Sequence, residues 1–392
     1  MKERTIPDAE RRARLVARHH LAKDAKSPET AVRAVVAMHS SDPATPFLGC
    51  WARVPKFSVE ALERALTEDK TLWRIHAMRR TLFVVDAGEG GLVEAAATRE
   101  IADKERKRLL GYLEGAVKAK SLGSWLEKVE EKVIAELGQH AELRTSELAK
   151  RVRELGTRIT IGSGKWQAES SLASRLLMVM AMDARIVRTR SAGTWRASQY
   201  GWAETERWFG AAPSPAEVAP AQAELVRRYV ATHGPVTLTD VRWWTGWTAR
   251  ASKAALQAIG AVTVRLEDGS SAFVVEGDEA PVKAKKGAVT LLPGLDPTPM
   301  GFKERAFYLG SHHQARLFDT NGNIGPTVWV DGRIVGGWAQ KKDGEVVVAL
   351  LEDVPKAARA KIDKEAAALT KWMDGVVTIP RFRTPLEREL SR

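Results

Sequence analysis

The sequence predicts an α+β protein in which helices followed by a β-hairpin recur three times before a β-rich C-terminal part. Residues 72–85 are rich in β-branched and aromatic side chains after several helical stretches, which is typical of a hairpin. Residues 145–149 are echoed by 237–241, a weak internal repeat. Asp-Gly pairs separate short β-branched runs after residue 260. Helices followed by a hairpin outline a winged-helix unit.

The elements follow this plan along the chain. The first unit has helices at 8–22, 28–38 and 59–66 before its hairpin. The second has a helix starting at Thr145, an apolar helix at 171–184, and a hairpin pairing 186–190 with 194–197. Helices at 221–232 and 252–259 precede a third hairpin, 262–266 with 272–275. The C-terminal part has strands at 289–292, 327–330, 334–338 and 346–350, and a closing helix at 355–373.

These elements predict five parts. They are a first winged helix at 1–90 that carries a candidate catalytic loop, a helical connector at 91–139, a second winged helix at 140–212, a third at 213–282, and a β-rich C-terminal domain at 283–392. Pro213, Pro215 and Pro220 mark the linker before the third winged helix. Three such units in one chain provide an extended surface without dimerisation, so we expect a monomer.

Composition favours a nucleic-acid partner. The chain has 392 residues, is 44% hydrophobic and carries a formal net charge of +12. This composition is that of a globular protein, and the charge favours a polyanion such as double-stranded DNA over an acidic membrane surface. The longest apolar run, at 176–182, is too short to span a bilayer, so no membrane partner is expected.

The single cysteine, Cys50, excludes an intramolecular disulfide and a cysteine-based zinc site. The adjacent pairs His19-His20 and His312-His313 point apart on a strand or helix and make poor metal sites. We therefore expect no metal and no cofactor. The charged stretch 1–14 has no apolar core segment, which argues against a signal peptide and fits a cytoplasmic protein.

The densest group of proton-handling side chains lies at 38–43, Met-His-Ser-Ser-Asp-Pro. Pro43 ends the preceding helical run, so His39, Ser41 and Asp42 are expected at or just past a helix terminus. Their side chains can then face a cleft. The alternative is that Ser41 and Asp42 only cap and turn the chain.

Basic residues provide candidate DNA contacts. Arg188, Arg190 and Arg196 alternate along the second hairpin and are expected to share exposure as a basic wing. The loop at 283–286 contains Lys283, Lys285 and Lys286.

Two regions together resemble a known family. They are 38–53 with Met78-Arg79-Arg80-Thr81-Leu82, and Leu291-Leu292-Pro293-Gly294-Leu295-Asp296-Pro297 with 321–338. These stretches resemble the bacterial winged-helix DNA glycosylases of the AlkZ and YcaQ type, and the resemblance covers nearly the whole chain. It implies three tandem winged helices around a DNA-binding concavity, excision of bulky or cross-linking alkyl adducts, and no metal. Arg53, Arg79 and Arg80 are the basic residues of the first matching region and are added to the candidate DNA contacts.

The chain departs from the family pattern where the chemistry is expected. The family has Gln-apolar-Gln or Gln-apolar-Asp directly before Asp-Pro, and here those two positions are His39 and Ser41. A neutral His39 is a possible general base, with Asp42 stabilising the developing oxocarbenium charge. The predicted function is a monofunctional DNA glycosylase that removes bulky N7-alkylpurine adducts. The alternatives are a catalytically inactive DNA-binding relative or a winged-helix transcriptional regulator.

Overall fold

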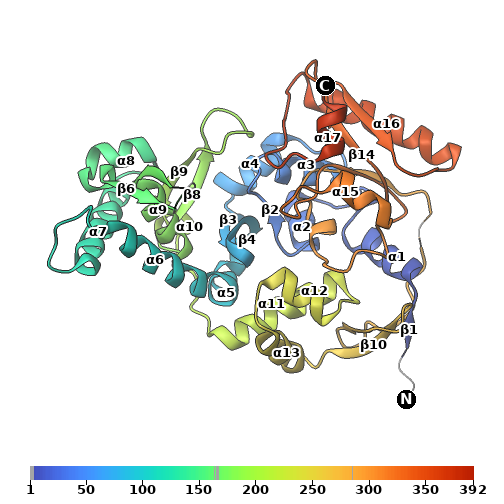
Figure 1. The fold of residues 1–392 in the computed structure, drawn as a ribbon, viewed down its shortest axis with the longest axis horizontal. Coiled ribbons are helices and arrows are strands. Elements are labelled where there is room, and N and C mark those ends of the chain that lie inside the picture. Colours follow the sequence, from blue (N-terminus) through green and yellow to red (C-terminus); the bar gives the residue numbers. More distant parts are fainter. Residues whose placement is uncertain (1–3, 163, 165–166, 285) are drawn as a thin grey trace. The chain divides into compact units, whose positions relative to one another are not determined.

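A computed structural model describes residues 4–392 apart from 163, 165, 166 and 285 (Figure 1). The chain divides into two compact units. The first unit comprises the residues up to 62 together with 223–392, and the second unit comprises 63–222. Helices and antiparallel strands occur in both, so the α+β class is confirmed.

The first unit begins with four short helices, and the loop at 40–42 lies between the second and the third. They are α1 (Asp8–Arg18), α2 (Pro28–Ala34), α3 (Thr45–Arg53) and α4 (Val59–Thr67), with the two-residue strand β2 (Met38–His39) between α2 and α3. The helix predicted at 28–38 ends four residues early. Two β-branched residues follow Ala34, and Val36 has a left-handed φ of 65°, which no α-helix accommodates.

The next part of the first unit is a helical layer with a small sheet. It contains α11 (Val218–His233), α12 (Leu238–Thr245) and α13 (Ala249–Ala258), followed by β10 (Val262–Leu266) and β11 (Ser271–Val274). The N-terminal strand β1 (Thr5–Ile6) pairs in parallel with β10. The hairpin predicted at 262–275 is therefore confirmed, and its sheet gains a strand that no sequence pattern indicated.

The C-terminal sheet is antiparallel in the order β12 (Val289–Leu292), β13 (Thr327–Val330), β14 (Arg333–Gln340) and β15 (Val346–Leu350). The helix α16 (Lys356–Met373) packs on β12 and β15, and α17 (Pro385–Leu390) packs on β14. A small residue permits the close approach of α17: a Cβ at Gly337 on β14 would lie 2.7 Å from Cδ2 of Leu386. All four predicted strands and the closing helix are confirmed.

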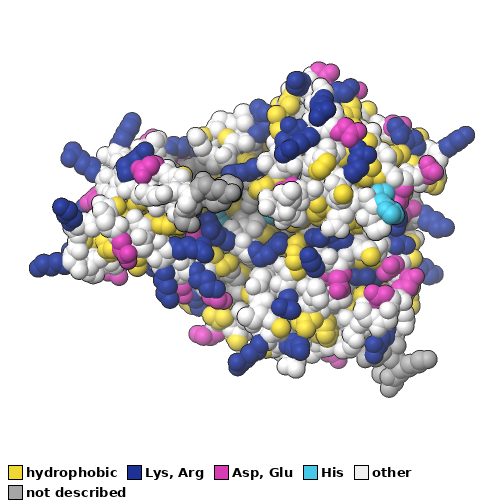
Figure 2. Space-filling model, in the orientation of Figure 1, with side chains coloured by type: hydrophobic (Ala, Val, Ile, Leu, Met, Phe, Trp, Pro, Cys, Tyr) yellow, Lys and Arg dark blue, Asp and Glu magenta, His cyan; other side chains and the backbone are white. Residues whose placement is uncertain are grey.

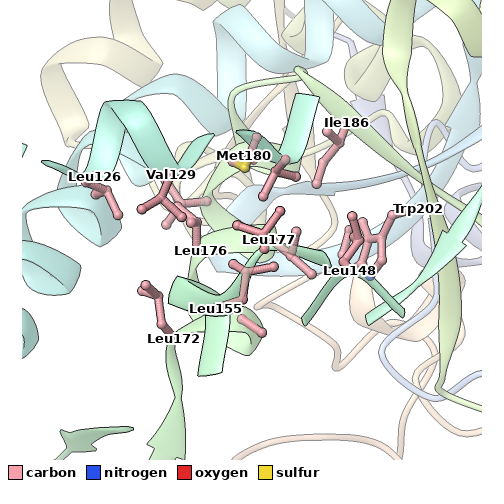
Figure 3. Close-up of a cluster of buried hydrophobic side chains, with 14 of the residues drawn as sticks. Leu126, Val129, Leu148, Leu155, Leu172, Leu176, Leu177, Met180, Ile186 and Trp202 are labelled. Atoms are coloured by element: carbon pink, nitrogen blue, oxygen red, sulfur yellow. The ribbon is translucent and has the colours of Figure 1, made fainter. Parts of the chain in front are cut away.

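The second unit starts with the predicted hairpin, β3 (Leu72–Ala77) and β4 (Thr81–Asp86). Its helices are α5 (Gly90–Val93), α6 (Arg99–Leu113), α7 (Leu122–Gln139), α8 (Thr145–Arg151), α9 (Leu172–Met182) and α10 (Thr205–Phe209). A sheet in the order β5 (Leu143–Arg144), β9 (Tyr200–Glu204) and β8 (Ile186–Ser191) and the pair β6 (Arg158–Ile161) and β7 (Ala168–Ser171) complete it. Leu148, Leu176, Leu177 and Trp202 meet in one buried cluster at its centre (Figure 3).

One strand prediction in this unit is wrong. The partner of β8 is β9 at 200–204, and the predicted strand 194–197 belongs to the loop before it. Tyr200 and Trp202 pack inward from β9, whereas 194–197 carries only one buried side chain, Trp195. Burial of the aromatic residues therefore decides the pairing.

Within the described ranges, no helix is long and apolar enough to cross a bilayer. Nor does any cluster of three or more His, Cys, Asp or Glu residues there have the arrangement to hold a metal ion.

A buried histidine pair connects three segments of the first unit. The rings of His19, which follows α1, and His233, at the end of α11, lie edge to face with centroids 4.5 Å apart. The Nδ1 atom of His19 lies 3.0 Å from the hydroxyl of Thr298, and the ring of His233 stacks on Tyr229. Burial lowers the pKa of His233 to about 3 and that of His19 well below its usual value. Both rings are therefore neutral at physiological pH.

This pair predicts a pH-dependent stability. Between about pH 6.5 and 3 the unfolded chain binds a proton at position 233 that the native chain does not, so stability falls as the pH is lowered through this range. We expect the slope of unfolding free energy against pH to be smaller in His233→Phe by up to about 1.4 kcal/mol per pH unit. Urea unfolding from pH 4 to 7 measures it. The variant His312→Phe at an exposed position is the control, and equal slopes in His233→Phe and wild type would contradict the prediction.

Candidate functional site

The candidate catalytic residues lie on the loop between β2 and α3. His39 and Ser40 are buried, and Ser41 and Asp42 are half-buried. The backbone N–H of Ser41 donates to Nδ1 of His39 over 3.4 Å. A nitrogen that accepts this hydrogen bond carries no proton, so the neutral imidazole carries its proton on Nε2.

Both carboxylate oxygens of Asp42 accept backbone hydrogen bonds. One oxygen accepts from Ala44 N at 3.0 Å, which forms a tight turn before α3. The other accepts from Arg381 N at 2.8 Å, and the Arg381 guanidinium donates to the Ser41 carbonyl at 3.2 Å. These contacts hold the loop against the C-terminal tail. Each oxygen keeps a further lone pair, so the carboxylate can still bind a water or face a cation.

Asp42 also faces a small cavity of about 20 Å³ within the first unit. Its lining includes Thr45 and Leu48 of α3, Gly294 of the loop after β12, and Trp338 and Gln340 of β14. The Thr45 hydroxyl donates to the Gly294 carbonyl at 2.9 Å and so fixes one wall. The volume suffices for about one water molecule. The loop therefore presents a carboxylate to a water-sized space.

Arg53 corrects one predicted DNA contact. Its side chain is fully buried, and its guanidinium forms an ion pair with Asp296 through contacts of 2.8 and 2.7 Å. It also donates to the hydroxyl of Thr298 and to the carbonyls of His19 and Gly49. The guanidinium is thus enclosed and cannot reach a phosphate. The sequence did not indicate that Arg53 is buried, because an arginine at the end of an apolar helix is usually exposed.

Arg53 and Asp296 instead join two segments that the family resemblance had singled out separately. Arg53 ends α3, the helix that follows the candidate catalytic loop, and Asp296 caps the short helix α14 (Pro297–Met300) after β12. The pair therefore fixes α3 on the C-terminal part of the first unit. Its role is to position the loop.

The other predicted basic contacts divide by exposure. Arg79 and Arg80 are exposed at the β3–β4 turn, both with left-handed φ, and Arg80 also contacts Glu105 at 3.1 Å. Arg190 and Arg196 are exposed as well. Arg188 was predicted to be as exposed as Arg190 and Arg196. It is only half-exposed, because its guanidinium lies over the ring of Trp202. A bulge between Arg188 and Ser191 breaks the alternation on which that prediction rested.

The loop before β12 contributes to a basic groove. Lys283 and Lys286 are exposed, and Lys285 lies outside the described residues. Lys286 lines a surface groove of about 410 Å³ together with Lys23, Lys361 and Lys364. The sequence did not predict Lys23, Lys361 and Lys364 as part of this groove, because they come from distant segments. The spacing of Lys361 and Lys364 along the predicted closing helix was a signal that could have indicated a basic face. Figure 2 shows Lys and Arg side chains gathered over α5 and α6 and around α17 on the face in view.

The candidate residues thus include a half-buried carboxylate and basic surface side chains. Comparison with known proteins identifies the class of protein. The solved structure of Streptomyces sahachiroi DNA glycosylase AlkZ has a TM-score of 0.73 with this chain at 19% identity, covering 94% of this chain and 97% of that one. This likeness shows a shared fold. A relative described as an interstrand DNA cross-link repair glycosylase, from the same organism, is 28% identical over 194 residues. That match spans 48% of this chain and about half, 50%, of the relative.

The family is shown by a longer match. The AlkZ-like DNA glycosylase family model matches residues 32–372, which include the candidate loop and the C-terminal sheet. The chain belongs to the AlkZ-like DNA glycosylase family.

The buried Arg53–Asp296 pair predicts a large and non-additive effect on stability. Arg53→Met leaves Asp296 as an unpaired buried charge and should lower the free energy of unfolding by about 3–5 kcal/mol. The double variant Arg53→Met/Asp296→Leu removes both charges and should recover much of this loss. Urea unfolding of the four proteins measures the coupling.

The surface pair Arg316–Glu389 supplies the control for that cycle, because both side chains are largely exposed. Arg316→Met should change stability by less than about 1 kcal/mol. A double variant as unstable as the sum of its two single variants would contradict the assigned role of Arg53.

Proposed function

We propose that this protein is a monofunctional DNA glycosylase that hydrolyses the N-glycosidic bond of bulky N7-alkylpurine adducts, interstrand cross-links included. Family membership supports the reaction class. The Streptomyces sahachiroi relative is described as an interstrand DNA cross-link repair glycosylase, which supports the cross-link substrate. The observation that carries the proposal is Asp42, a carboxylate held by two backbone donors beside a water-sized cavity.

In the proposed reaction, Asp42 has the central role. An N7-alkylated purine is already cationic, so it leaves as a neutral base when the C1′–N9 bond breaks and takes the bond electrons. The sugar then carries oxocarbenium character, which a nearby carboxylate stabilises. Water adds to C1′ and passes its proton to the carboxylate of Asp42.

His39 has a different role from that of a general base. Because its Nδ1 accepts from the Ser41 N–H, the neutral ring has no free lone pair for the proton of water. We assign His39 to the geometry of the loop, through its contact with the Ser41 N–H. Ser41 contributes its backbone N–H and carbonyl to the loop geometry, and its side chain has no assigned step.

We propose that the winged-helix units and the exposed arginines bind the DNA. The three-stranded sheets β1–β10–β11 and β5–β9–β8, each with neighbouring helices, support the winged-helix interpretation. Arg79, Arg80, Arg190 and Arg196 are exposed in the second unit, and Lys283 and Lys286 are exposed in the first unit. Such side chains contact phosphates and position the duplex without reading sequence.

The test is excision of a defined adduct. Duplex DNA carrying a bulky N7-alkylguanine is incubated under single-turnover conditions, and abasic sites are detected by alkaline strand cleavage. We expect Asp42→Asn to lower the excision rate by about 10²-fold or more with little change in DNA affinity, and His39→Ala to lower it by a smaller factor.

Asp343→Asn is a matched control, because Asp343 also accepts a backbone hydrogen bond in a tight turn of the first unit, from Glu345 N at 3.0 Å. Its excision rate should equal that of wild type. Thermal melts of each variant exclude unfolding as the cause. Tight DNA binding without excision of any N7-alkylpurine tested would replace the proposal with that of a non-catalytic DNA-binding protein.

A further inference from the structure

Two arginines of the second unit, one buried and one half-buried, lie against aromatic rings. The guanidinium of Arg74, on β3, lies 4.9 Å from the ring centroid of Tyr200, and that of Arg188, on β8, lies 4.8 Å from that of Trp202. Arg74 is only 4% exposed, and Arg188 is half-buried. Neither forms an ion pair with any residue that the structure describes. By contrast, Arg106 and Arg185 in the same unit both pair with Glu130.

Several buried polar atoms in this group have no hydrogen-bond partner among the residues that the structure describes. They are Nε of Arg74, Nη1 of Arg188, Nδ1 of His76 and the hydroxyl of Tyr200. Buried donors in proteins are nearly always satisfied, and an unpaired buried cation strongly disfavours folding. A cluster of such groups therefore requires a functional explanation.

The sheet geometry brings these groups together. Arg74 and His76 are two residues apart on β3 and so share one face, as do Tyr200 and Trp202 on β9. Arg188 is paired with Trp202 in the β8–β9 ladder, and β3 lies against β8.

The electrostatics support the same grouping. Burial lowers the pKa of Arg188 to about 10, with the Tyr200 oxygen opposing this effect and the Arg74 cation adding to it. Burial also lowers the pKa of Arg74, and that of His76 falls well below its usual value through burial and the neighbouring Arg188 and Arg80. Arg188 and Arg74 therefore lie close enough to repel each other, and the charge of Glu63 offsets only part of the effect of burial on Arg74.

We propose that Arg74, Arg188, His76 and Tyr200 form a binding site for one phosphate group, supplied by a backbone phosphodiester of bound DNA. Two guanidinium groups, an imidazole and a phenol match the oxygens of a phosphate and would all be satisfied by it. The DNA source rests on the proposed function, whereas binding of the phosphate itself does not.

Repulsion between the two guanidinium groups distinguishes a phosphate site from a role of these arginines in stabilising the fold. If the arginines serve the fold, their removal lowers stability. If they serve an absent anion, replacing one of them with an apolar side chain of similar length relieves the repulsion. We therefore expect the melting temperature of Arg188→Met in chloride buffer to equal or exceed that of wild type. Arg188→Gln should show the same result.

The first arm of the experiment uses the full chain and inorganic phosphate. Thermal melts in phosphate and in chloride at equal ionic strength should show a higher Tm in phosphate for wild type, and no such difference for Arg188→Met or Arg74→Met. Arg185→Met is the matched control, since it removes an arginine that Glu130 already pairs. It should keep the phosphate response. An unchanged response in both Arg188→Met and Arg74→Met would overturn the proposal.

The second arm identifies the source of the phosphate with undamaged duplex DNA and fluorescence anisotropy, so excision plays no part in the readout. Arg188→Met should weaken binding about tenfold and reduce the slope of log affinity against log salt by about one. Arg185→Met should have a smaller effect on both the DNA affinity and the salt slope. Loss of the phosphate response with unchanged DNA affinity would assign the site to a free phosphate monoester and overturn the DNA source.

Discussion

The buried ion pair of Arg53 with Asp296 is the interaction on which the candidate active loop depends. It joins residues 243 positions apart, and both side chains are fully enclosed. A second connection, from Asp42 to the backbone of Arg381, joins residues 339 apart. Together they hold the loop and α3 against the C-terminal part of the first unit.

Function and stability oppose each other in two places. The loop has a carboxylate next to a small cavity, and the second unit has two arginines that form no ion pair with a described residue. Neither arrangement helps an isolated chain to fold. The large cluster of Leu, Val and Met side chains in the second unit (Figure 3) provides the apolar burial that offsets such groups. Sites that disfavour folding are where binding to a ligand has most to contribute.

Local patterns predicted much of the fold. The hairpin at 72–85 and the four C-terminal strands follow from β-branched runs bounded by turn residues, and the structure confirms them. The helix predicted at 28–38 begins where expected but ends at Ala34, because Val36 adopts a left-handed conformation. The strand predicted at 194–197 was wrong, because aromatic burial favours 200–204. Such outcomes depend on tertiary packing that a short window of sequence does not contain.

The site was predictable only in part. The proline after Asp42 indicated a loop that exposes polar side chains, and the family motif pointed to the same residues. Nothing in the sequence separated Arg53, which is buried with Asp296, from Arg79, which is exposed. Which nitrogen of His39 is occupied by the Ser41 N–H also depends on atomic geometry. Composition favoured a polyanionic partner and the family resemblance specified DNA. The roles of individual side chains required coordinates.

The most direct measurement is a crystal structure of this protein bound to duplex DNA that contains a cationic mimic of the oxocarbenium sugar. The account predicts the carboxylate of Asp42 within about 3 Å of the cationic centre, with its hydrogen bond from Arg381 N retained. A mimic bound against other side chains, with Asp42 contacting only its own backbone neighbours, would contradict the account.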